Sequence, residues 1–390
     1  MTILGIFLIN EIRTGGDRRY LELLELLAER GNRIFVIMNI FLNYTPKHLT
    51  QIKLPVKYVR HRFPPASFLF CESIKKNLAF IKNKMGNMQK IDFIHIHGDI
   101  YLKSAIFLKK VLQVPLFYAS RCNDVDRARI LRAKGGLSLK EYLFSLVYEL
   151  VNRSRERQIA RFADLATFQN AIDRDIFVKR TKYRIEKIIV IPGNIGLPRC
   201  KPKWENKNTS EKVQTLVYIG SLSPSKGFLD LLKALAELKE RGFGGLRCYI
   251  LGRTENTGQT KRFIETLNIQ EMVTFEGFQD PFPYLARCDM LVYPTLYDAY
   301  PDTALEALHT GCPVIGSRVG GLPDLLKYPE LLFETGDIQE IADRIEKCIR
   351  EPKFYQCIRR LCAARTEAHH FDWAAQFEMA MKIKNRELYC

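Results

Sequence analysis

The alternation of short apolar runs with longer amphipathic stretches is the feature that most constrains this chain. A short apolar run is typical of a strand buried on both faces, and an amphipathic stretch is typical of a helix that covers such a strand. Because the two patterns follow each other almost throughout, we expect α/β units in which helices cover both faces of parallel sheets. The expected strands are Leu4–Ile9, Ile34–Met38, Phe93–Ile96, Leu116–Tyr118, Ile188–Ile191, Thr215–Ile219, Cys248–Leu251, Val273–Phe275, Met290–Tyr293 and Pro313–Ile315.

One segment, residues 192–210, interrupts this alternation with three prolines, two glycines and a polar tail. Such a composition is typical of a connection between folded units. We therefore expect residues 1–192 to form an N-terminal Rossmann-like domain, residues 193–210 to form a linker, and residues 211–370 to form a second Rossmann-like domain.

The last residues, 371–390, carry apolar side chains at helical spacing, namely Phe371, Trp373, Phe377 and Met381. This spacing predicts a terminal helix with one apolar face. We expect that helix to pack back on the N-terminal domain and complete it.

Positive charge is concentrated in the first half of the chain. The net charge is +17, and residues 1–200 hold 35 of the 60 Lys+Arg but only 17 of the 43 Asp+Glu. No helix-turn-helix or aromatic RNA-binding motif accompanies this charge, so we expect no nucleic-acid partner. The basic segments Lys53–Arg62, Lys75–Lys90 and Arg153–Arg161 instead favour an anionic membrane surface, at about 1 kcal/mol per near-surface cation.

Residues 142–151, YLFSLVYELV, place apolar side chains next to these arginines, although a helix face buried in the core would explain them too. No run of about 18 apolar residues predicts a spanning helix. The apolar run Ile3–Ile9 has no basic residue before it and no small-residue cleavage site after it. The ten cysteines show no C-x-x-C spacing, which favours reduced thiols. We expect a cytoplasmic protein, peripheral at the inner face of the plasma membrane.

Gly15 and Gly16 stand between the first expected strand and the helix that follows it. Glycines in such a turn let backbone N–H groups approach an anion at the helix N-terminus. The spacing is not G-x-G-x-x-G, so ordinary turn chemistry explains the pair as well as a ligand loop does. The nearby Arg13, Arg18 and Arg19 favour an anion.

A second strand-to-helix loop, GSLSPSKGF at residues 220–228, places Lys226 directly before Gly227. An ammonium group at this helix entry could bind a diphosphate, and the Ser221 hydroxyl could donate a further hydrogen bond to it. The loop lacks the P-loop pattern, and an exposed lysine at a helix entry is the plainer alternative.

Residues 294–326, PTLYDAYPDTALEALHTGCPVIGSRVGGLPDLL, hold the densest group of candidate residues. Asp298 precedes a helix that Pro301 and Asp302 open, and Glu306 lies about one turn inside that helix. Helix-terminal amides can hold phosphate oxygens, and carboxylates accept hydrogen bonds from sugar hydroxyls. The combination suits a nucleotide-sugar, although acidic residues near a helix start are also common partners of the helix dipole.

This segment resembles the signature of the retaining glycosyltransferases of family 4. That family has the GT-B fold, in which two Rossmann-like doubly wound domains face each other across a cleft. Its motif runs E-x7-E, then A-x-x-x-G-x-P-V-I and V-G-G-x-P-E. The matching positions are Asp298, Glu306, Ala307, Gly311, Pro313, Val314, Ile315, Val319, Gly320, Gly321, Pro323 and Asp324.

The resemblance extends over nearly all of the chain. Residues 220–227 resemble the family's G-R-x-x-x-x-K-G loop, residues 248–252 its strand ending in glycine, and residues 273–278 its V-x-F-x-G segment. Gly15–Gly16 and residues 92–98, DFIHIHG, match the landmarks of its first domain, and FDW near the C-terminus matches its Trp-containing helix.

Four positions depart from the family's pattern. Asp298 replaces the usual first glutamate and shortens its reach by one methylene group. Ser221 replaces the usual arginine, which removes a permanent charge from the expected diphosphate site. Arg121 stands where many members have histidine, next to Cys122 where glycine is usual, and either contact with the donor or bracing of a loop would explain it.

By this resemblance, the second domain holds a nucleoside diphosphate-sugar of the UDP or GDP type and the first holds the acceptor. The anomeric configuration is retained, and no metal or other cofactor is needed. The implied catalytic residues are Lys226, Asp298 and Arg121. The implied donor contacts are Gly15, Gly16, Ser221, Lys226, Gly252, Asp298, Ala299, Tyr300, Pro301, Asp302, Thr303 and Glu306. On the acceptor side are His97, near a strand's carboxyl end, and Asp124. Separately from the resemblance, we expect His95 and His97 on opposite faces of the strand, with His95 as a core side chain.

The resemblance therefore implies a hexosyltransferase that acts on a lipid-linked or anionic glycan acceptor in cell-surface polysaccharide or lipopolysaccharide biosynthesis. Two alternatives stay open. A nucleotide-sugar epimerase of the same architecture would need no acceptor. A non-catalytic glycan-binding protein on a degenerate transferase fold would explain the changes at Ser221 and Asp298.

Overall fold

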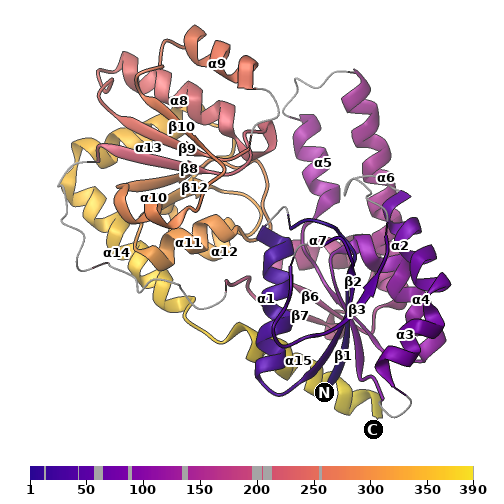
Figure 1. Cartoon of the computed structure of the whole chain (residues 1–390). Helices are drawn as coiled ribbons and strands as arrows, with labels where there is room; N and C mark the ends of the chain where they lie inside the picture. The colour runs from indigo at the N-terminus through magenta and orange to yellow at the C-terminus, as the bar shows by residue number, and fades with distance from the viewer. Residues whose placement is uncertain are drawn as a thin grey trace. The chain divides into compact units, whose positions relative to one another are not determined.

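The computed structural model of the chain describes residues 1–12, 15–42, 44–56, 65–86, 90–133, 139–195, 204, 213–253 and 257–389. The chain forms two compact units (Figure 1). The first consists of Met1–Gly196 together with Asp372–Cys390, and the second of Leu197–Phe371. Most of the expected linker, Arg13, and parts of the basic segments Lys53–Arg62 and Lys75–Lys90 lie outside the described residues. Within those ranges, no helix is both long enough and apolar enough to cross a bilayer.

A seven-stranded parallel sheet in the order β3-β2-β1-β4-β5-β6-β7 forms the centre of the first unit. Ile3 pairs with Ile34 of β2 on one side and with Phe93 of β4 on the other, so the first strand lies inside the sheet. All three side chains are buried. The strands are β1 Thr2–Phe7, β2 Arg33–Asn39, β3 Thr50–Leu54, β4 Phe93–His97, β5 Leu116–Ala119, β6 Leu165–Phe168 and β7 Ile188–Val190.

Helices cover both faces of this sheet (Figure 1). Helices α1 and α15 pack together on one face, while α2, α4, α6 and α7 pack in succession on the other. The bounds are α1 Gly15–Glu29, α2 Pro65–Lys76, α3 Leu78–Met85, α4 Leu102–Leu112, α5 Asp124–Ala133, α6 Leu139–Phe162, α7 Ala171–Thr181 and α15 Trp373–Tyr389. Apolar side chains point into both faces, which explains why the strands read as nearly continuous apolar runs.

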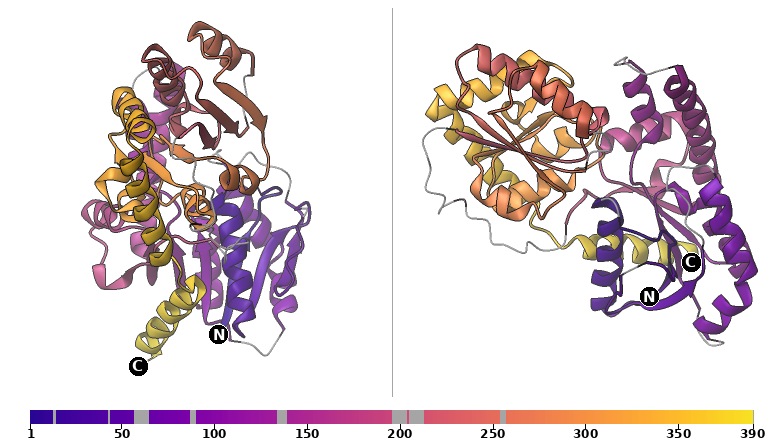
Figure 2. Two further views of the ribbon diagram at one scale, coloured as in Figure 1. Left: turned by 90° about the vertical axis from the view of Figure 1, so that its left-hand side faces the viewer. Right: turned by 45° about the horizontal axis from the view of Figure 1, so that its top comes forward.

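The C-terminal helix α15 belongs to the first unit and lies beside α1 in both views of Figure 2. The ring of Phe377 lies 6.1 Å from the His95 ring and 5.9 Å from the Phe117 ring. Arg30 at the end of α1 bonds Asp372 at 2.6 Å and Glu378 at 2.8 Å. These contacts attach the last residues of the chain to its first helix.

The second unit has a six-stranded parallel sheet in the order β10-β9-β8-β11-β12-β13. Its strands are β8 Thr215–Ile219, β9 Arg247–Leu251, β10 Val273–Gly277, β11 Met290–Tyr293, β12 Val314–Ser317 and β13 Leu332–Phe333. Its helices are α8 Phe228–Glu240, α9 Thr257–Thr266, α10 Phe282–Arg287, α11 Asp302–Thr310, α12 Leu322–Leu326, α13 Ile338–Arg350 and α14 Pro352–Ala368.

In each sheet the first strand of the unit lies next to the fourth, so the strand order reverses between these two. The reversal falls between β1 and β4 in the first unit and between β8 and β11 in the second. The loops that leave such a pair of strands separate at the carboxyl edge, which opens the crevice where α/β proteins bind ligands. The α/β prediction with two Rossmann-like doubly wound units is confirmed.

The contact of α15 with the sheet makes a prediction about stability. Phe377→Ala should lower the free energy of unfolding of the first unit by about 3–5 kcal/mol, because it removes a buried ring and leaves a cavity. Urea unfolding followed by the fluorescence of Trp373, whose ring lies 5.4 Å from Phe377, reports on this helix. Met379→Ala, at an exposed position of the same helix, is the control and should change little. Equal effects of the two substitutions would contradict this packing.

Candidate active site

Lys226 lies in the loop that leaves β8, the first strand of the second sheet. The loop forms a short 3-10 turn, η3 (Pro224–Lys226), and enters α8 through Gly227. Gly227 has a φ of +65°, and a Cβ there would lie 1.6 Å from the carbonyl oxygen of Pro294. Both observations require glycine, and the close approach holds Lys226 beside the loop that leaves β11.

Lys226 forms an ion pair with Asp298, with 2.5 Å between Nζ and Oδ2. The hydroxyl of Tyr293 donates to the same carboxylate oxygen at 2.9 Å and accepts from Lys226 at 3.3 Å. Burial, then the negative charges of Asp298 and Glu306, raise the pKa of Tyr293 well above its usual value. The hydroxyl therefore stays protonated and orients Asp298.

Tyr293 was not among the residues that the sequence analysis selected. Its only signal in the sequence is its place as the last residue of an expected strand, next to the reversal of strand order. Which side chain at such a strand end faces the site depends on the register and twist of the strand. Those are properties of the folded sheet.

Two glycines in the loop after β12 lie against the backbone of the loop that contains Asp298. Gly320 has a φ of +56°, and a Cβ there would lie 1.9 Å from the carbonyl oxygen of Asp298. A Cβ on Gly321 would lie 1.8 Å from the carbonyl oxygen of Ala299, and the Gly321 N–H donates to the Asp298 carbonyl at 3.0 Å. Only glycine permits this approach of two backbones, so the pair fixes the position of Asp298.

Helix α11 begins next to this loop. Pro301 occupies its N-cap position and makes no side-chain capping bond, and Asp302 and Thr303 begin its first turn. The first N–H groups of a helix have no partner within the helix, so they can bond an anion. Glu306, one turn inside, is buried, and its charge contributes to the raised pKa of Tyr293. The helix entry, Glu306 and the ion pair therefore occupy one site.

Tyr300 contributes its backbone to this site, while its side chain points elsewhere. Its N–H donates to Asp298 Oδ1 at 3.3 Å. Its hydroxyl lies 2.6 Å from His369 Nε2, and His369 Nδ1 lies 2.8 Å from the Arg365 carbonyl oxygen. Because a carbonyl only accepts, Nδ1 carries the proton and Nε2 accepts from Tyr300. Burial lowers the pKa of His369, which keeps it neutral for this bond.

Gly252 brings the loop after β9 to the same edge, since a Cβ there would lie 1.8 Å from the Gly220 carbonyl oxygen. Ser221, the position where the resemblance predicts arginine, has its hydroxyl 2.9 Å from that of Ser223. The backbone of Arg253 accepts from the Leu222 N–H at 3.1 Å. The guanidinium of Arg253, the residue directly after Gly252, lies over the ring of Phe278, 4.3 Å from its centre.

In the first unit, Arg121 lies against the loop between β1 and α1. Its Nη1 is 2.7 Å from Oδ1 of Asp17, a buried residue in the first turn of α1. A Cβ on Gly16 would lie 2.6 Å from Arg121 Nε, and Gly98, with a φ of +87°, faces the stem of the arginine. Two roles were considered for Arg121, contact with the donor and bracing of a loop. This geometry fits the second, because the side chain lies against the Gly15–Gly16 loop.

Asp124 lies at the start of α5, just past the carboxyl end of β5. Burial, then the charge of Asp99, raise the pKa of its carboxyl group, whereas Arg127 and a hydrogen bond with Tyr148 oppose this shift. Asp99 itself pairs with Arg155 at 3.0 Å. Two carboxylates, tied to cations, therefore lie at the carboxyl edge of the first sheet.

The prediction that His95 and His97 lie on opposite faces of their strand is wrong. Residues two apart in a strand share one face, and both rings lie 5.4 Å from the ring of Tyr20. Both histidines are buried, and burial lowers the pKa of each. His97 is nevertheless the one at the strand's end, and the charges of Arg121 and Arg19 lower its pKa further. A neutral His97 beside the Arg121–Asp17 pair is what the structure shows.

The selected residues thus form two groups, each at the carboxyl edge of its own sheet. Lys226, Asp298, Glu306 and the adjoining glycines lie together in the second unit, and Gly15, Gly16, His97, Arg121 and Asp124 lie in the first. In the part of the chain that the structure describes, no three His, Cys, Asp or Glu side chains are grouped as a metal site requires.

Comparison with known proteins identifies this arrangement. Residues 201–360 match the sequence family described as glycosyl transferases group 1. The second unit is a group 1 glycosyltransferase domain. The chain is 21% identical over 352 residues to the N-acetyl-alpha-D-glucosaminyl L-malate synthase of Bacillus anthracis, covering 86% of this chain and 84% of that one. The relatives of the chain bear out this assignment of the second unit, and the finer assignment to family 4 stays a prediction.

Another relative covers almost the whole chain. It is the N-acetylgalactosamine-N,N'-diacetylbacillosaminyl-diphospho-undecaprenol 4-alpha-N-acetylgalactosaminyltransferase of Campylobacter jejuni, 21% identical over 382 residues, or 95% of this chain and 96% of the relative.

Solved structures show the same fold over the full length of this chain. The sucrose-phosphate synthase of Thermosynechococcus elongatus superimposes with a TM-score of 0.78 at 18% identity, covering 100% of this chain and 99% of that one. HepE of Anabaena, in complex with UDP-glucose, gives a TM-score of 0.70 at 18% identity with the same coverage. The GT-B fold expected from the sequence is confirmed.

The bond from Tyr293 to Asp298 makes a second prediction. Tyr293→Phe should lower the free energy of unfolding of the second unit by about 1–3 kcal/mol, because the ring stays but a buried bond to a charged group is lost. Tyr249→Phe on the neighbouring strand β9 is the matched control. Thermal unfolding of both variants measures the difference, and identical melting temperatures would show that the hydroxyl does not orient Asp298.

Proposed function

We propose that this glycosyltransferase moves a hexosyl group from a UDP- or GDP-sugar to a lipid-linked or anionic glycan acceptor, with retention of anomeric configuration. The observation that carries the proposal is the joining of Lys226, Asp298 and Glu306 at the entry of α11, where strand order reverses. A cation, helix-terminal amides and two carboxylates are the groups that a diphosphate and a sugar require.

The chemical difficulty in this reaction is the negative charge that grows on the leaving diphosphate as the glycosidic bond breaks. Preorganised donors aimed at that charge lower the barrier. Lys226, the Ser221 hydroxyl, and the first N–H groups of α11, at Asp302 and Thr303 after Pro301, are proposed for this role. Because they supply the positive charge, the proposal needs no bound metal or other cofactor.

The carboxylates would hold the two ends of the donor. Asp298 would accept from hydroxyls of the transferred sugar and shield positive charge at its anomeric carbon, and Glu306 would accept from the ribose hydroxyls. No side chain is assigned as a covalent nucleophile. The acceptor oxygen would attack the face from which the diphosphate leaves, and the departing phosphate oxygen would take the acceptor's proton.

The Lys226–Asp298 ion pair has a consequence for donor binding. Each group is the counter-ion of the other before the donor arrives. In the proposed complex, Lys226 pairs with the diphosphate, whose negative charge replaces that of the Asp298 carboxylate. Asp298 then accepts hydrogen bonds from neutral sugar hydroxyls. Tyr293, which donates to Asp298, stays in place to orient it.

The acceptor side of the proposal rests on the first unit and on relatives. The relative from Campylobacter jejuni is named for a diphospho-undecaprenol substrate, and another from Escherichia coli is named as a serotype-specific mannosyltransferase. These names and the basic first half of the chain support a role in cell-surface polysaccharide or lipopolysaccharide biosynthesis, at the inner face of the plasma membrane. Gly15, Gly16 and Asp124 would face the acceptor or the donor phosphates, and Arg121 and the buried His97 would hold this edge in place.

The site assignment predicts two different kinetic defects. Lys226→Ala should lower kcat by about 10²–10³, because it removes a group that acts on the leaving diphosphate. Glu306→Ala should weaken donor affinity by about ten-fold or more, because ribose hydroxyls lose a charged acceptor. A thermal-shift screen of nucleotide-sugars first identifies the donor. Lys233→Ala, at an exposed position of α8, is the charge-matched control for Lys226.

If both variants transferred sugar from every donor at the wild-type rate, the site would be wrongly placed. Donor turned over to an epimer without acceptor would indicate an epimerase instead, and donor binding without any turnover would indicate a glycan-binding protein.

The stereochemistry is tested separately. Proton NMR of the product formed in the first minutes of reaction should show the anomeric configuration of the donor sugar. An inverted product would exclude the retaining mechanism while leaving the donor site intact.

A further inference from the structure

Helix α6 carries a stripe of apolar side chains that face water. Six exposed apolar residues lie three or four positions apart along the first three turns of the helix, so their side chains share one face. Their exposed fractions run from 37% to 76%. We call this set the α6 stripe; it consists of Leu139, Tyr142, Leu143, Leu146, Val147 and Leu150. The alternative that this face is buried in the core is wrong.

Two of the three acidic residues of α6, Glu149 and Glu156, lie outside the stripe and form ion pairs within the unit, while Glu141 is exposed in the first turn. Glu149 pairs with Arg129 at 2.9 Å and with Arg153 at 2.8 Å. Glu156 pairs with Arg180 of α7 at 2.8 Å. The helix therefore directs these carboxylates inward and its apolar residues outward.

Exposed arginines continue the stripe toward the end of the helix. Arg157 and Arg161 follow Leu139 and Leu143 by 18 residues, or about five turns, and so lie on the same face. Both arginines are exposed. The same face thus passes from apolar to cationic along the axis, which is typical of a helix that lies at a membrane surface.

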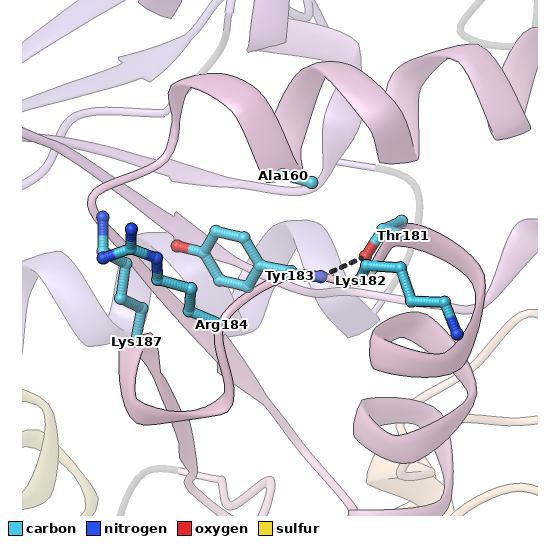
Figure 3. A pocket seen from close by; sticks show the side chains of 6 residues that line it. All are labelled: Ala160, Thr181, Lys182, Tyr183, Arg184 and Lys187. Atoms are coloured by element: carbon cyan, nitrogen blue, oxygen red, sulfur yellow. Dashed lines mark hydrogen bonds between the residues drawn. The ribbon is translucent and has the colours of Figure 1, made fainter.

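A cationic pocket of about 330 Å³ lies at the carboxyl end of α6 (Figure 3). It is lined by Ala160, Thr181, Lys182, Tyr183, Arg184 and Lys187. Ala160 belongs to α6 and follows Tyr142 of the stripe by about five turns, which places the pocket at the edge of the same face. Figure 3 shows Arg184 and Lys187 on one side of the Tyr183 ring and Lys182 on the other.

The backbone around this pocket is well anchored. The Tyr183 hydroxyl donates to the Ala163 carbonyl at 2.9 Å, and the Tyr183 N–H donates to the Thr181 hydroxyl at 3.2 Å. Lys182 takes the left-handed conformation that ends α7, with a φ of 57°. The three cations therefore extend from a fixed turn around a cavity large enough for a phosphate group.

Helix α4 packs on α6, and helix α2 packs on α4 and has a similar surface. Helix α2 exposes Phe68 and Leu69 and ends in Lys75 and Lys76, and it packs on α4. Lys103 of α4 lies 5.8 Å from the ring of Phe68. Apolar side chains flanked by lysines thus recur on this layer of the first unit.

We propose that the α6 stripe and the cationic pocket form a docking surface for an anionic phospholipid bilayer. The stripe enters the boundary between headgroups and acyl chains, and Arg157, Arg161 and the pocket cations bind lipid phosphates. The proposal deepens the proposed function and rests on it for the location of the acceptor. The surface itself is independent of the donor sugar and of the mechanism.

Charge argues for a bilayer as the occupant. A second copy of this chain docked on the same face by two-fold symmetry would bring Arg157, Arg161 and the pocket cations close to their own copies, which costs free energy. An anionic leaflet satisfies the cations and the apolar stripe together.

Sedimentation with vesicles tests the stripe. The wild-type chain should bind vesicles that contain phosphatidylglycerol more strongly than vesicles of phosphatidylcholine alone. Leu143→Gln/Leu150→Gln should weaken this binding by about ten-fold or more, because two leucines no longer enter the bilayer. Ile172→Gln/Met379→Gln, two residues of the first unit that are 42% and 64% exposed, is the matched control and should bind as wild type does. All four positions are exposed, so the melting temperature should be unchanged.

A second pair of variants tests the pocket. Lys182→Gln/Arg184→Gln/Lys187→Gln should lose about ten-fold or more of the preference for phosphatidylglycerol, because three near-surface cations are removed. Lys261→Gln/Arg262→Gln/Lys353→Gln removes the same charge from exposed positions of the second unit and should keep the preference.

Absence of binding to phosphatidylglycerol vesicles at low salt would overturn the proposal. So would equal losses in a test variant and its control, or a dimer in analytical ultracentrifugation that the stripe variant dissolves while vesicle binding persists. The donor site is judged apart from these results, because the stripe variant should bind the nucleotide-sugar and turn it over as wild type does. Vesicle binding without donor binding would overturn only the proposed function.

Discussion

The close approach of glycines to backbone carbonyl oxygens is the constraint on which the second unit's site depends. Gly227, Gly252, Gly320 and Gly321 each lie where a Cβ would come within 2 Å of a carbonyl oxygen in a neighbouring loop. These contacts join the loops that leave β8, β9, β11 and β12 at one edge of the sheet. Lys226 and Asp298, far apart in the chain, meet there because the backbones that carry them touch.

That constraint also explains the electrostatics of the site. The loops bring together a lysine, an aspartate and a tyrosine whose raised pKa keeps its proton, so Lys226 and Asp298 neutralise each other. In the proposed complex, a diphosphate replaces Asp298 as the ionic partner of Lys226, and the carboxylate keeps its hydrogen bond from Tyr293. In the first unit, Arg121 and Asp17 form a comparable pair behind the Gly16 loop. The large positive charge of the first half is mostly elsewhere, on its helices and surface turns, where it can act on a partner without entering either site.

Much of the fold could be predicted from the sequence, because strands buried on both faces leave a strong apolar pattern. Each of the ten expected strands overlaps an observed one. Three observed strands were not expected, and their apolar patterns are weaker. β3 is an edge strand with polar residues, Thr50–Leu54. β6 has only four residues, Leu165–Phe168, and β13 only two, Leu332–Phe333.

The sequence by itself determined that the chain is α/β and that Lys226, Asp298 and Glu306 are the residues to examine, because glycine and charge spacing in single loops are local properties. Tertiary structure decided the rest. It turned Tyr293 toward Asp298, put Arg121 against Gly16, and buried His97 with His95 because strand geometry gives them one face. It also decided which face of α6 meets water. An apolar periodic pattern is the same for a helix in a core and a helix on a membrane, and only the packing of neighbouring helices distinguishes the two.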